Sequence, residues 1–571
     1  MLNKHCKFAL AAAGALSTML LTGCFDDSYD LDNIDTTMQF EINDLTLPLN
    51  LKPVQFDDMV DLTSEECIEV VDGEYVLIKN GSFESEEINI RKIHSEAIDD
   101  GNDDFEQHIA SVIPGVAVPF NPYDYRFSYT YNNVDKYIKS IVSGKVDLTL
   151  SMNFETLYDN GTPFACEFNN LVLKLPAGFY GTLSDGREIG PDSPNVITIG
   201  SATTDANGKL TISFHVTSFE FAKTGAILEG QLFNLSTSMG IQSGSFKAVD
   251  GNGNPGSITL DFKISELDVQ TFTGRVYYLV ENLDPEDVML NDLPDVLTNE
   301  NSDVSLENPQ LYVALANPLS DYDVTASTDV KISQIRPEGA EIVTAQLAKP
   351  MVVGIQPGRQ NFCLSPKKPG KYITDFENST WAEMTNLGNI VSGKGLPEGL
   401  KINFIEPKMN ETDVEDFHLG QNLGTVHGDY KFFAPLDLGN GSHIYYEDEA
   451  SGWGLGGGDE KMEISKLSLN ADVVSSLPVA VTLKATPIDE NGLVIPDVTM
   501  STVDIPAFGK CPIEILMTGK ILNLDGMKYT LTVKAGQDAS VLRPTQSLTL
   551  NNLKIRVSGK YIVDEDDDDT F

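Results

Sequence analysis

Residues 123–131 read "YDYRFSYTY", with a ring at every second position and polar residues between them. Successive side chains of a β-strand point to opposite faces, so this spacing places all five rings on one face. Rings on one face pack well as cross-strand pairs, which predicts a half-buried strand. Four of the rings are tyrosines whose hydroxyls need partners when buried. An exposed stacking platform for sugars, or the wall of an apolar groove, therefore stays open for Tyr123, Tyr125, Tyr129 and Tyr131.

Turn signals recur through the rest of the chain. The dipeptide Asn-Gly, which suits type I′ hairpin turns, occurs at 80–81, 160–161, 207–208, 252–253, 440–441 and 491–492. The segments 74–90, 203–216 and 486–498 each read as strand, turn, strand. Candidate helices are short and cover 56–62, 94–112, 134–141, 285–297 and 378–387. The pattern predicts an all-β fold with several β-sandwich domains in tandem and a few short helices.

A chain of 571 residues is too long for a single core. The expected order is a lipoprotein signal peptide (1–23), an acidic tether (24–44), a β domain with short helices (45–140), three β-sandwiches (141–285, 286–405 and 406–563) and an acidic tail (564–571). Segments 311–328 and 467–487 share one plan, an alternating strand, a proline break and a second strand. The plan loosely resembles the sandwich domains of late-embryogenesis-abundant type 2 proteins, although two independent hairpins would look the same.

The N-terminus carries an export signal. Lys4 and Lys7 precede fourteen mostly apolar residues (8–21), too few to span a bilayer but typical of a secretory signal. The run ends in Leu21, Thr22, Gly23 and Cys24, which resembles the bacterial lipobox. The resemblance implies signal-peptidase recognition of residues 21–23, cleavage before Cys24, and acylation of Cys24 as a membrane anchor. An ordinary signal peptide with a chance cysteine, or a buried helix, is the alternative.

Five aspartates crowd the segment 25–35, "FDDSYDLDNID". The run resembles the acidic leader behind the lipidated cysteine of Bacteroidota-type surface lipoproteins. That resemblance implies an outer-membrane protein, lipid-anchored and facing the cell surface. A solvated tether on the periplasmic face is the alternative.

Composition excludes one class of partner. The chain has 39 basic and 85 acidic residues, a net charge of −46, so it repels nucleic acid. No cofactor is expected. Two acidic loops are candidates for weak Ca²⁺ binding. A solvated turn is the better interpretation of 99–104. A hairpin turn is the better interpretation of 250–256 with Asp261. The cysteines of the body are widely spaced, which leaves long-range disulfides or buried free thiols open: Cys67, Cys166, Cys363 and Cys511.

Residues 441–454, "GSHIYYEDEASGWG", form a second candidate ligand site. Tyr445, Tyr446 and Trp453 stand among carboxylates, a mixture that suits glycan binding, although a packed loop anchor explains Trp453 equally well. No zinc, P-loop or serine-hydrolase motif is present, so no catalytic or metal residue is assigned and nothing positive indicates an enzyme.

The expected function is a lipid-anchored envelope protein that acts as a binding or structural module. Its ligand would be a glycan or a protein, or it would be an accessory subunit of a surface assembly. The alternatives are a carrier of a lipid or other apolar ligand, a polysaccharide-acting hydrolase, and a fimbrial subunit that polymerises by strand donation.

Overall fold

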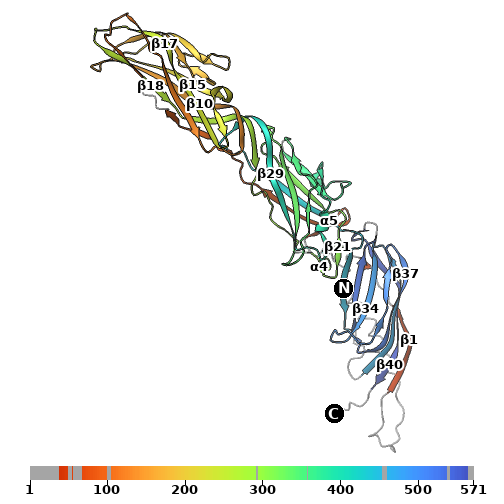
Figure 1. Ribbon diagram of the computed structural model, residues 1–571. Helices are drawn as coiled ribbons and strands as arrows, with labels where there is room; N and C mark the ends of the chain where they lie inside the picture. The colour runs from red at the N-terminus through yellow and green to blue at the C-terminus, as the bar shows by residue number, and fades with distance from the viewer. Residues whose placement is uncertain are drawn as a thin grey trace, which may run out of the picture.

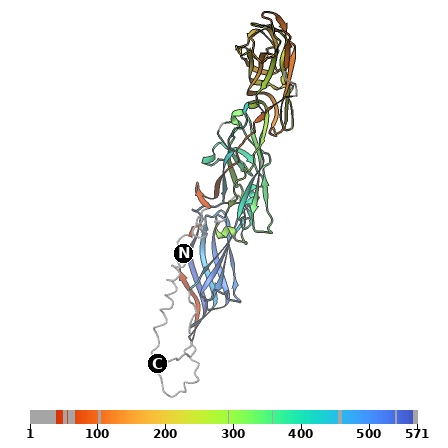
Figure 2. The same cartoon turned by 90° about the vertical axis from the view of Figure 1, so that its left-hand side faces the viewer.

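The computed structural model describes residues 38–48, 54–55, 67–99, 105–290, 293–356, 358–452, 460–536 and 540–563. The all-β prediction is confirmed: strands make up 61% of the described residues and helices 4%. In the described ranges each α-helix has four residues, and these are α3 (Phe221–Thr224), α4 (Asp295–Thr298) and α5 (Leu387–Ile390). The strands form three sandwiches that follow one another along an elongated molecule (Figures 1 and 2).

The terminal sandwich contains the first and the last strand. One sheet is built from β1 (Met38–Pro48), β2 (Val54–Gln55), β33 (Glu460–Ser475), β35 (Thr499–Met500), β37 (Lys510–Leu522) and β40 (Ser547–Val563). The other is built from β21 (Asp303–Ser305), β28 (Ser392–Lys394), β32 (His443–Ala450), β34 (Ala480–Ile488), β36 (Thr502–Ile505) and β38 (Gly526–Lys534). A two-stranded ribbon adds β31 (Asp437–Leu438) and β39 (Ser540–Val541).

The middle sandwich packs a six-stranded sheet on half of a thirteen-stranded one. The first comprises β3 (Ile68–Val71), β4 (Glu74–Glu84), β22 (Gln310–Ala316), β26 (Arg359–Ser365), β27 (Thr380–Glu383) and β30 (His427–Pro435). The second contributes β5 (Ile93–Ser95), β19 (Leu267–Leu279), β20 (Val288–Met289), β23 (Ala326–Ile335), β24 (Thr344–Gln346), β25 (Met351–Val353) and β29 (Gly399–His418).

The distal sandwich uses the other half of the thirteen-stranded sheet. Its strands there are β7 (Phe105–Ile109), β10 (Ile138–Tyr158), β12 (Phe179–Leu183), β13 (Glu188–Ile189), β15 (Lys209–Glu220) and β18 (Gly256–Ile264). The facing sheet comprises β6 (Ala97–Asp99), β8 (Ala117–Pro119), β9 (Tyr123–Tyr131), β11 (Cys166–Lys174), β14 (Val196–Thr203), β16 (Ile227–Glu229) and β17 (Leu232–Ala248).

The chain runs out to the distal sandwich and back, so the sandwiches are nested. The middle sandwich combines 68–95 with most of 267–435. The terminal one combines 38–55 with 437–563 and also takes β21 and β28 from within 267–435. The expected tandem order differs from this arrangement, and its borders at 140 and 405 fall inside β10 and β29. The reason is long-range pairing, because β1 lies antiparallel to β40 from Met38 opposite Val563 to Pro48 opposite Lys554.

One strand joins the middle and distal sandwiches. The first half of β10 pairs with β19 of the middle sandwich, and the second half pairs with β18 of the distal one. At about 3.3 Å per residue, β10 is roughly 70 Å long. A shared sheet replaces an interdomain linker at this junction, which makes the two sandwiches one stiff unit.

Most expected helices are strands instead. Segment 94–112 contains β6 and β7, and 134–141 contains the start of β10. Segments 285–297 and 378–387 keep only α4 and the first residue of α5, while 56–62 lies outside the described residues. In β7 the side chains alternate buried and exposed, so sheet pairing overrides the weak helical spacing.

The predicted turns have mixed outcomes. Gly208 and Gly492 adopt the left-handed conformation at φ 70° and 73°, as turns require. However, β14 and β15, on either side of Gly208, belong to opposite sheets, so this turn crosses between sheets. The same crossing occurs between β22 and β23 and between β33 and β34, the two segments with a shared plan.

Asn80 and Gly81 form no turn; they lie inside β4, where Gly81 stands opposite Tyr430. A Cβ atom at Gly81 would lie 2.6 Å from the Tyr430 hydroxyl oxygen. Two residues along the same pair, Gly428 stands opposite Phe83 in the same relation. Each glycine is thus covered by an aromatic ring from the neighbouring strand.

Because the Tyr430 ring covers Gly81, we expect Gly81 and its neighbour Asn80 to differ strongly in their tolerance of substitution. Gly81→Val should lower the free energy of unfolding by about 1–3 kcal/mol, because the Tyr430 ring must move. Asn80→Thr, at an exposed strand position, should change it by less than about 0.5 kcal/mol. Chemical denaturation of both variants measures the difference. Equal destabilisation by the two substitutions would contradict the strand assignment.

Candidate functional site

Four connections meet at the free end of the distal sandwich, and we call them the tip loops. They are residues 110–116, 159–165, 204–208 and 249–255. Strand register brings them together, because Gly256 pairs with both Tyr158 and Ile109. On the facing sheet, Cys166 pairs with Ala248. The tip loops therefore lie at the opposite end of the molecule from β1 and β40 (Figure 1).

Hydrogen bonds join the tip loops to one another. Buried Thr156 donates its backbone N–H to the Gly208 carbonyl at 2.9 Å and its hydroxyl to the Phe164 carbonyl at 2.5 Å. Further bonds run from Asp159 N to Pro255 O (3.1 Å), from Val112 N to Asn254 O (2.8 Å) and from Ala165 N to Asp250 Oδ1 (2.9 Å). These cross-links hold the loops in one arrangement before any ligand arrives, which reduces the ordering cost of binding.

The tip loops expose carboxylates and amides. Asp159, Asp205 and Asp250 are all exposed at Asp/Asn-Gly turns. Asp205 Oδ1 accepts the backbone N–H groups of Lys209 (2.8 Å) and Asn207 (2.9 Å), and the bond from Lys209 lowers the pKa of the Asp205 carboxyl. The turn thus holds a negative charge at a fixed place.

A group of exposed aliphatic side chains lies beside these carboxylates. Ile113 and Val116 are each 50% exposed and Val249 is 55% exposed. The Gly115 N–H donates to the Ala248 carbonyl at 2.9 Å, which holds the 113–116 loop against the 249–255 loop. Exposed aliphatic groups on a rigid frame, rimmed by charge, are typical of a protein-binding surface. Sequence motifs did not single out these residues, although the apolar run "IPGVA" between two strands is a usable signal.

The aromatic face of β9 points into the distal sandwich. Tyr125 stacks on Phe262 of the opposite sheet with ring centroids 4.6 Å apart. Buried Tyr129 donates its hydroxyl to the Ser265 carbonyl at 2.8 Å, and burial raises its pKa. Tyr123 and Tyr131 are half-buried against the same core. The rings join the two sheets, as the packing alternative predicted, while ligand binding by Tyr123, Tyr125, Tyr129 or Tyr131 stays a prediction.

The second predicted site lies in the terminal sandwich, away from the tip. Tyr445 and Tyr446 are half-buried on β32. The Tyr445 hydroxyl donates to Glu447, which Lys528 also contacts at 3.3 Å. The bond from Tyr445 lowers the pKa of Glu447, and burial raises the pKa of Tyr445. Trp453 lies outside the described residues, as do Leu21, Thr22, Gly23 and Cys24.

The four cysteines of the body are thiols at separate places in the fold. Cys67, Cys166 and Cys363 are buried and Cys511 is half-buried. Burial raises the pKa of Cys166 to about 12 and that of Cys363 to about 11, which makes both thiols unreactive. The described residues therefore contain no disulfide among these four.

The described part of the chain holds no group of three or more His, Cys, Asp or Glu side chains arranged for a metal ion. In the suggested calcium loop at 250–256, the Asp250 carboxylate accepts the Ala165 N–H. Asp261 lies on β18 opposite Asn153 instead of in the loop. Most of the other loop, 99–104, lies outside the described residues.

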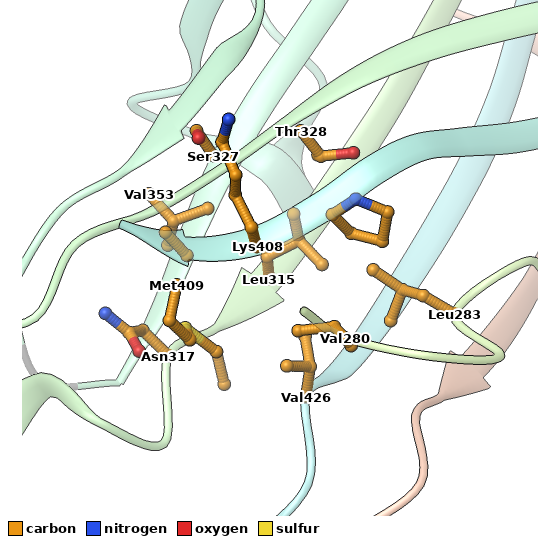
Figure 3. Close-up of a pocket in the computed structure, with 13 residues that line it drawn as sticks. Val280, Leu283, Leu315, Asn317, Ser327, Thr328, Val353, Lys408, Met409 and Val426 are labelled. Atoms are coloured by element: carbon orange, nitrogen blue, oxygen red, sulfur yellow. The ribbon is translucent and has the colours of Figure 1, made fainter. Parts of the chain in front are cut away.

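An apolar crevice opens between the sheets of the middle sandwich (Figure 3), where Val280, Leu283 and Leu315 line it. Its interior has room for about one water molecule. Asn317, at its edge, donates a hydrogen bond from its side-chain amide to the Val324 carbonyl at 2.7 Å. At this size the crevice is a packing seam.

No described protein family matches the chain, and no curated protein matches it either. A solved structure from Parabacteroides distasonis, described as a "putative secreted protein", is similar with a TM-score of 0.35 and 13% identity. The similarity covers 50% of this chain and 89% of that one. A score at this level carries no argument about fold or function. In the described residues, no helix has the length and apolar character that crossing a bilayer requires.

Proposed function

We propose that this protein is a lipid-anchored outer-membrane protein that presents the tip loops to a protein ligand at the cell surface. The observation that carries the proposal is the out-and-back course of the chain. Because β1 pairs with β40, the chain leaves the membrane tether and returns in the terminal sandwich. The tip loops lie at the far end (Figure 2).

The tether limits how far the terminal sandwich stands from the membrane. Met38 is the fourteenth residue after Cys24, and fourteen extended residues span at most about 50 Å. Beyond the terminal sandwich, the thirteen-stranded sheet carries the distal sandwich outward without a linker. A stiff support of this kind holds a binding surface clear of the membrane.

The chemistry of the tip favours a protein ligand over a glycan. Glycan sites commonly use an exposed aromatic ring for stacking, whereas the aromatic ring of the tip loops belongs to Phe164, which is 2% exposed. The tip instead offers aliphatic Ile113, Val116 and Val249 beside fixed carboxylates. A partner with an apolar patch rimmed by basic residues complements that surface.

Epitope insertion on intact cells tests where the tip lies. An epitope between Asn252 and Gly253, in a tip loop, should be labelled by antibody on intact cells. The matched insertion between Asn491 and Gly492 tests in the same way whether antibody reaches the terminal sandwich. The Cys24→Ala variant should lose membrane attachment. Labelling of the tip only after the outer membrane is opened would overturn the surface placement, and a membrane-bound Cys24→Ala variant would overturn the anchor.

Binding is tested with a matched pair of charge substitutions. Once a ligand is captured from extracellular proteins, Ile113→Asp with Val116→Asp should abolish its binding. Val142→Asp, at a 57% exposed position on β10 outside the tip, should leave it unchanged. Equal binding by the wild type, the double variant and Val142→Asp would contradict a site at the tip.

A further inference from the structure

The side chains that the structure describes in β1, residues 40–46, contribute little to the core. Of residues 40–46, Ile42 is half-buried and the others are exposed, including Phe40 at 55% and Leu45 at 41%. The strand is the edge of its sheet and is held by its antiparallel pairing with β40, at nine positions. Along residues 40–46 the attachment therefore depends mainly on backbone hydrogen bonds to β40, whose net contribution is about 1 kcal/mol each.

The neighbouring strand does not need β1 to stay in place. β40 pairs along most of its length with β33 on its other side, and Leu548 and Val557 are buried at 8% and 6% exposure. If β1 leaves, β40 keeps on that side only its short pairing with β2 at Ser547 and Leu548. The rest of β40 becomes an unpaired edge, which is a template for another strand. A strand identical to β1 fits that edge without any change in register.

We propose that β1 exchanges between neighbouring copies of this protein, so that β1 of one copy pairs with β40 of a second copy. The exchange replaces one set of contacts with an identical set, so its net cost is small. The short tether from Cys24 keeps the terminal sandwiches of anchored copies at a similar height. This common height raises their effective concentration for one another.

Geometry favours exchange over simple edge contact between two copies. Antiparallel pairing of two β1 edges would turn one elongated molecule upside down relative to the other, which two copies anchored in one membrane cannot do. Exchange keeps β1 antiparallel to β40 and leaves both molecules pointing outward. The product is a pair of upright copies linked at their membrane-proximal ends.

Split cysteine cross-linking tests this. Two full-length chains with different epitope tags are co-expressed, one carrying Phe40→Cys and the other Tyr561→Cys, positions that face each other in β1 and β40. Cys511→Ser in both chains removes the half-buried native thiol. Oxidation of membranes with copper phenanthroline should give a covalent heterodimer carrying both tags on a non-reducing gel.

The control is a pair that exchange of β1 cannot bring together between chains. Lys466 and Ser558 face each other in β33 and β40 of one sheet, and Lys466→Cys with Ser558→Cys split over two chains should give no heterodimer. Both substitutions of the first pair placed in one chain should still cross-link and report correct folding. Absence of the heterodimer, or an equal yield from the control, would overturn the proposal. The result does not depend on ligand binding or on which leaflet holds the anchor.

Discussion

Replacing Phe154 with alanine should lower the free energy of unfolding of the distal sandwich by about 3–5 kcal/mol. Phe154 lies on β10 and is 1% exposed. Its ring contacts Phe168 of the facing sheet at 4.8 Å between centroids and the edge of Phe120 at 6.0 Å. Removal of the ring would leave a cavity between two sheets whose strands are fixed by their pairings, so the site cannot collapse to fill it.

Hydrogen exchange measured by mass spectrometry locates this effect. Amides of β9, β11 and β17 should exchange faster in Phe154→Ala, while those of β33 and β37 keep their wild-type rates. Phe508→Ala is the control, because Phe508 is 70% exposed and its loss should change stability by less than about 0.5 kcal/mol. Unchanged exchange in the distal strands would show that the Phe154 cluster is not the core of that sandwich.

Gly274→Val should weaken the junction of the middle and distal sandwiches by about 1–3 kcal/mol or more. Gly274 of β19 stands between Ile141 of β10 and Val414 of β29. A Cβ atom there would overlap the Ser140 carbonyl oxygen. The register of β10 and β19 is irregular at this point, so the backbones approach too closely for any side chain.

The matched control is Gly200→Val, also a strand glycine, whose added Cβ would meet no atom within 4 Å. Hydrogen exchange should rise in residues 138–146 and 269–279 of Gly274→Val, and its melting temperature should fall. Gly200→Val should keep the wild-type melting temperature. If both variants behave alike, the shared sheet does not depend on the close approach at Gly274.

Local sequence predicted the strands well and the helices poorly. Alternation in 123–131 placed the rings of β9 on one inward face, since the two-residue period of a strand is a local property. The expected helix at 94–112 failed because short helical spacing competes with pairing to strands far away in sequence. Phe105 of β7 faces Leu260 of β18, a contact that no local window contains.

The local sequence could not distinguish a glycine in a turn from a glycine covered by an aromatic ring of the neighbouring strand. Gly208 and Gly492 adopt positive φ in turns, as the Asn-Gly pattern indicates. Gly81 has the same neighbour type but lies under the Tyr430 ring. The difference depends on which strand pairs with β4, and that partner lies about 350 residues later, a separation that follows from the pairing of Gly81 with Tyr430.

The sequence by itself determined the all-β class, the acidic surface, and the residues on which the proposed export and anchoring depend, because alternation, charge and a signal segment are all written locally. The tertiary structure alone decided that the sandwiches are nested, that β10 joins two of them, and that four loops form one rigid tip. Each of these results rests on pairing between strands remote in the chain, above all β1 with β40. Backbone hydrogen bonding is almost the same for every residue, so the partner of a strand is chosen by the packing of the whole fold.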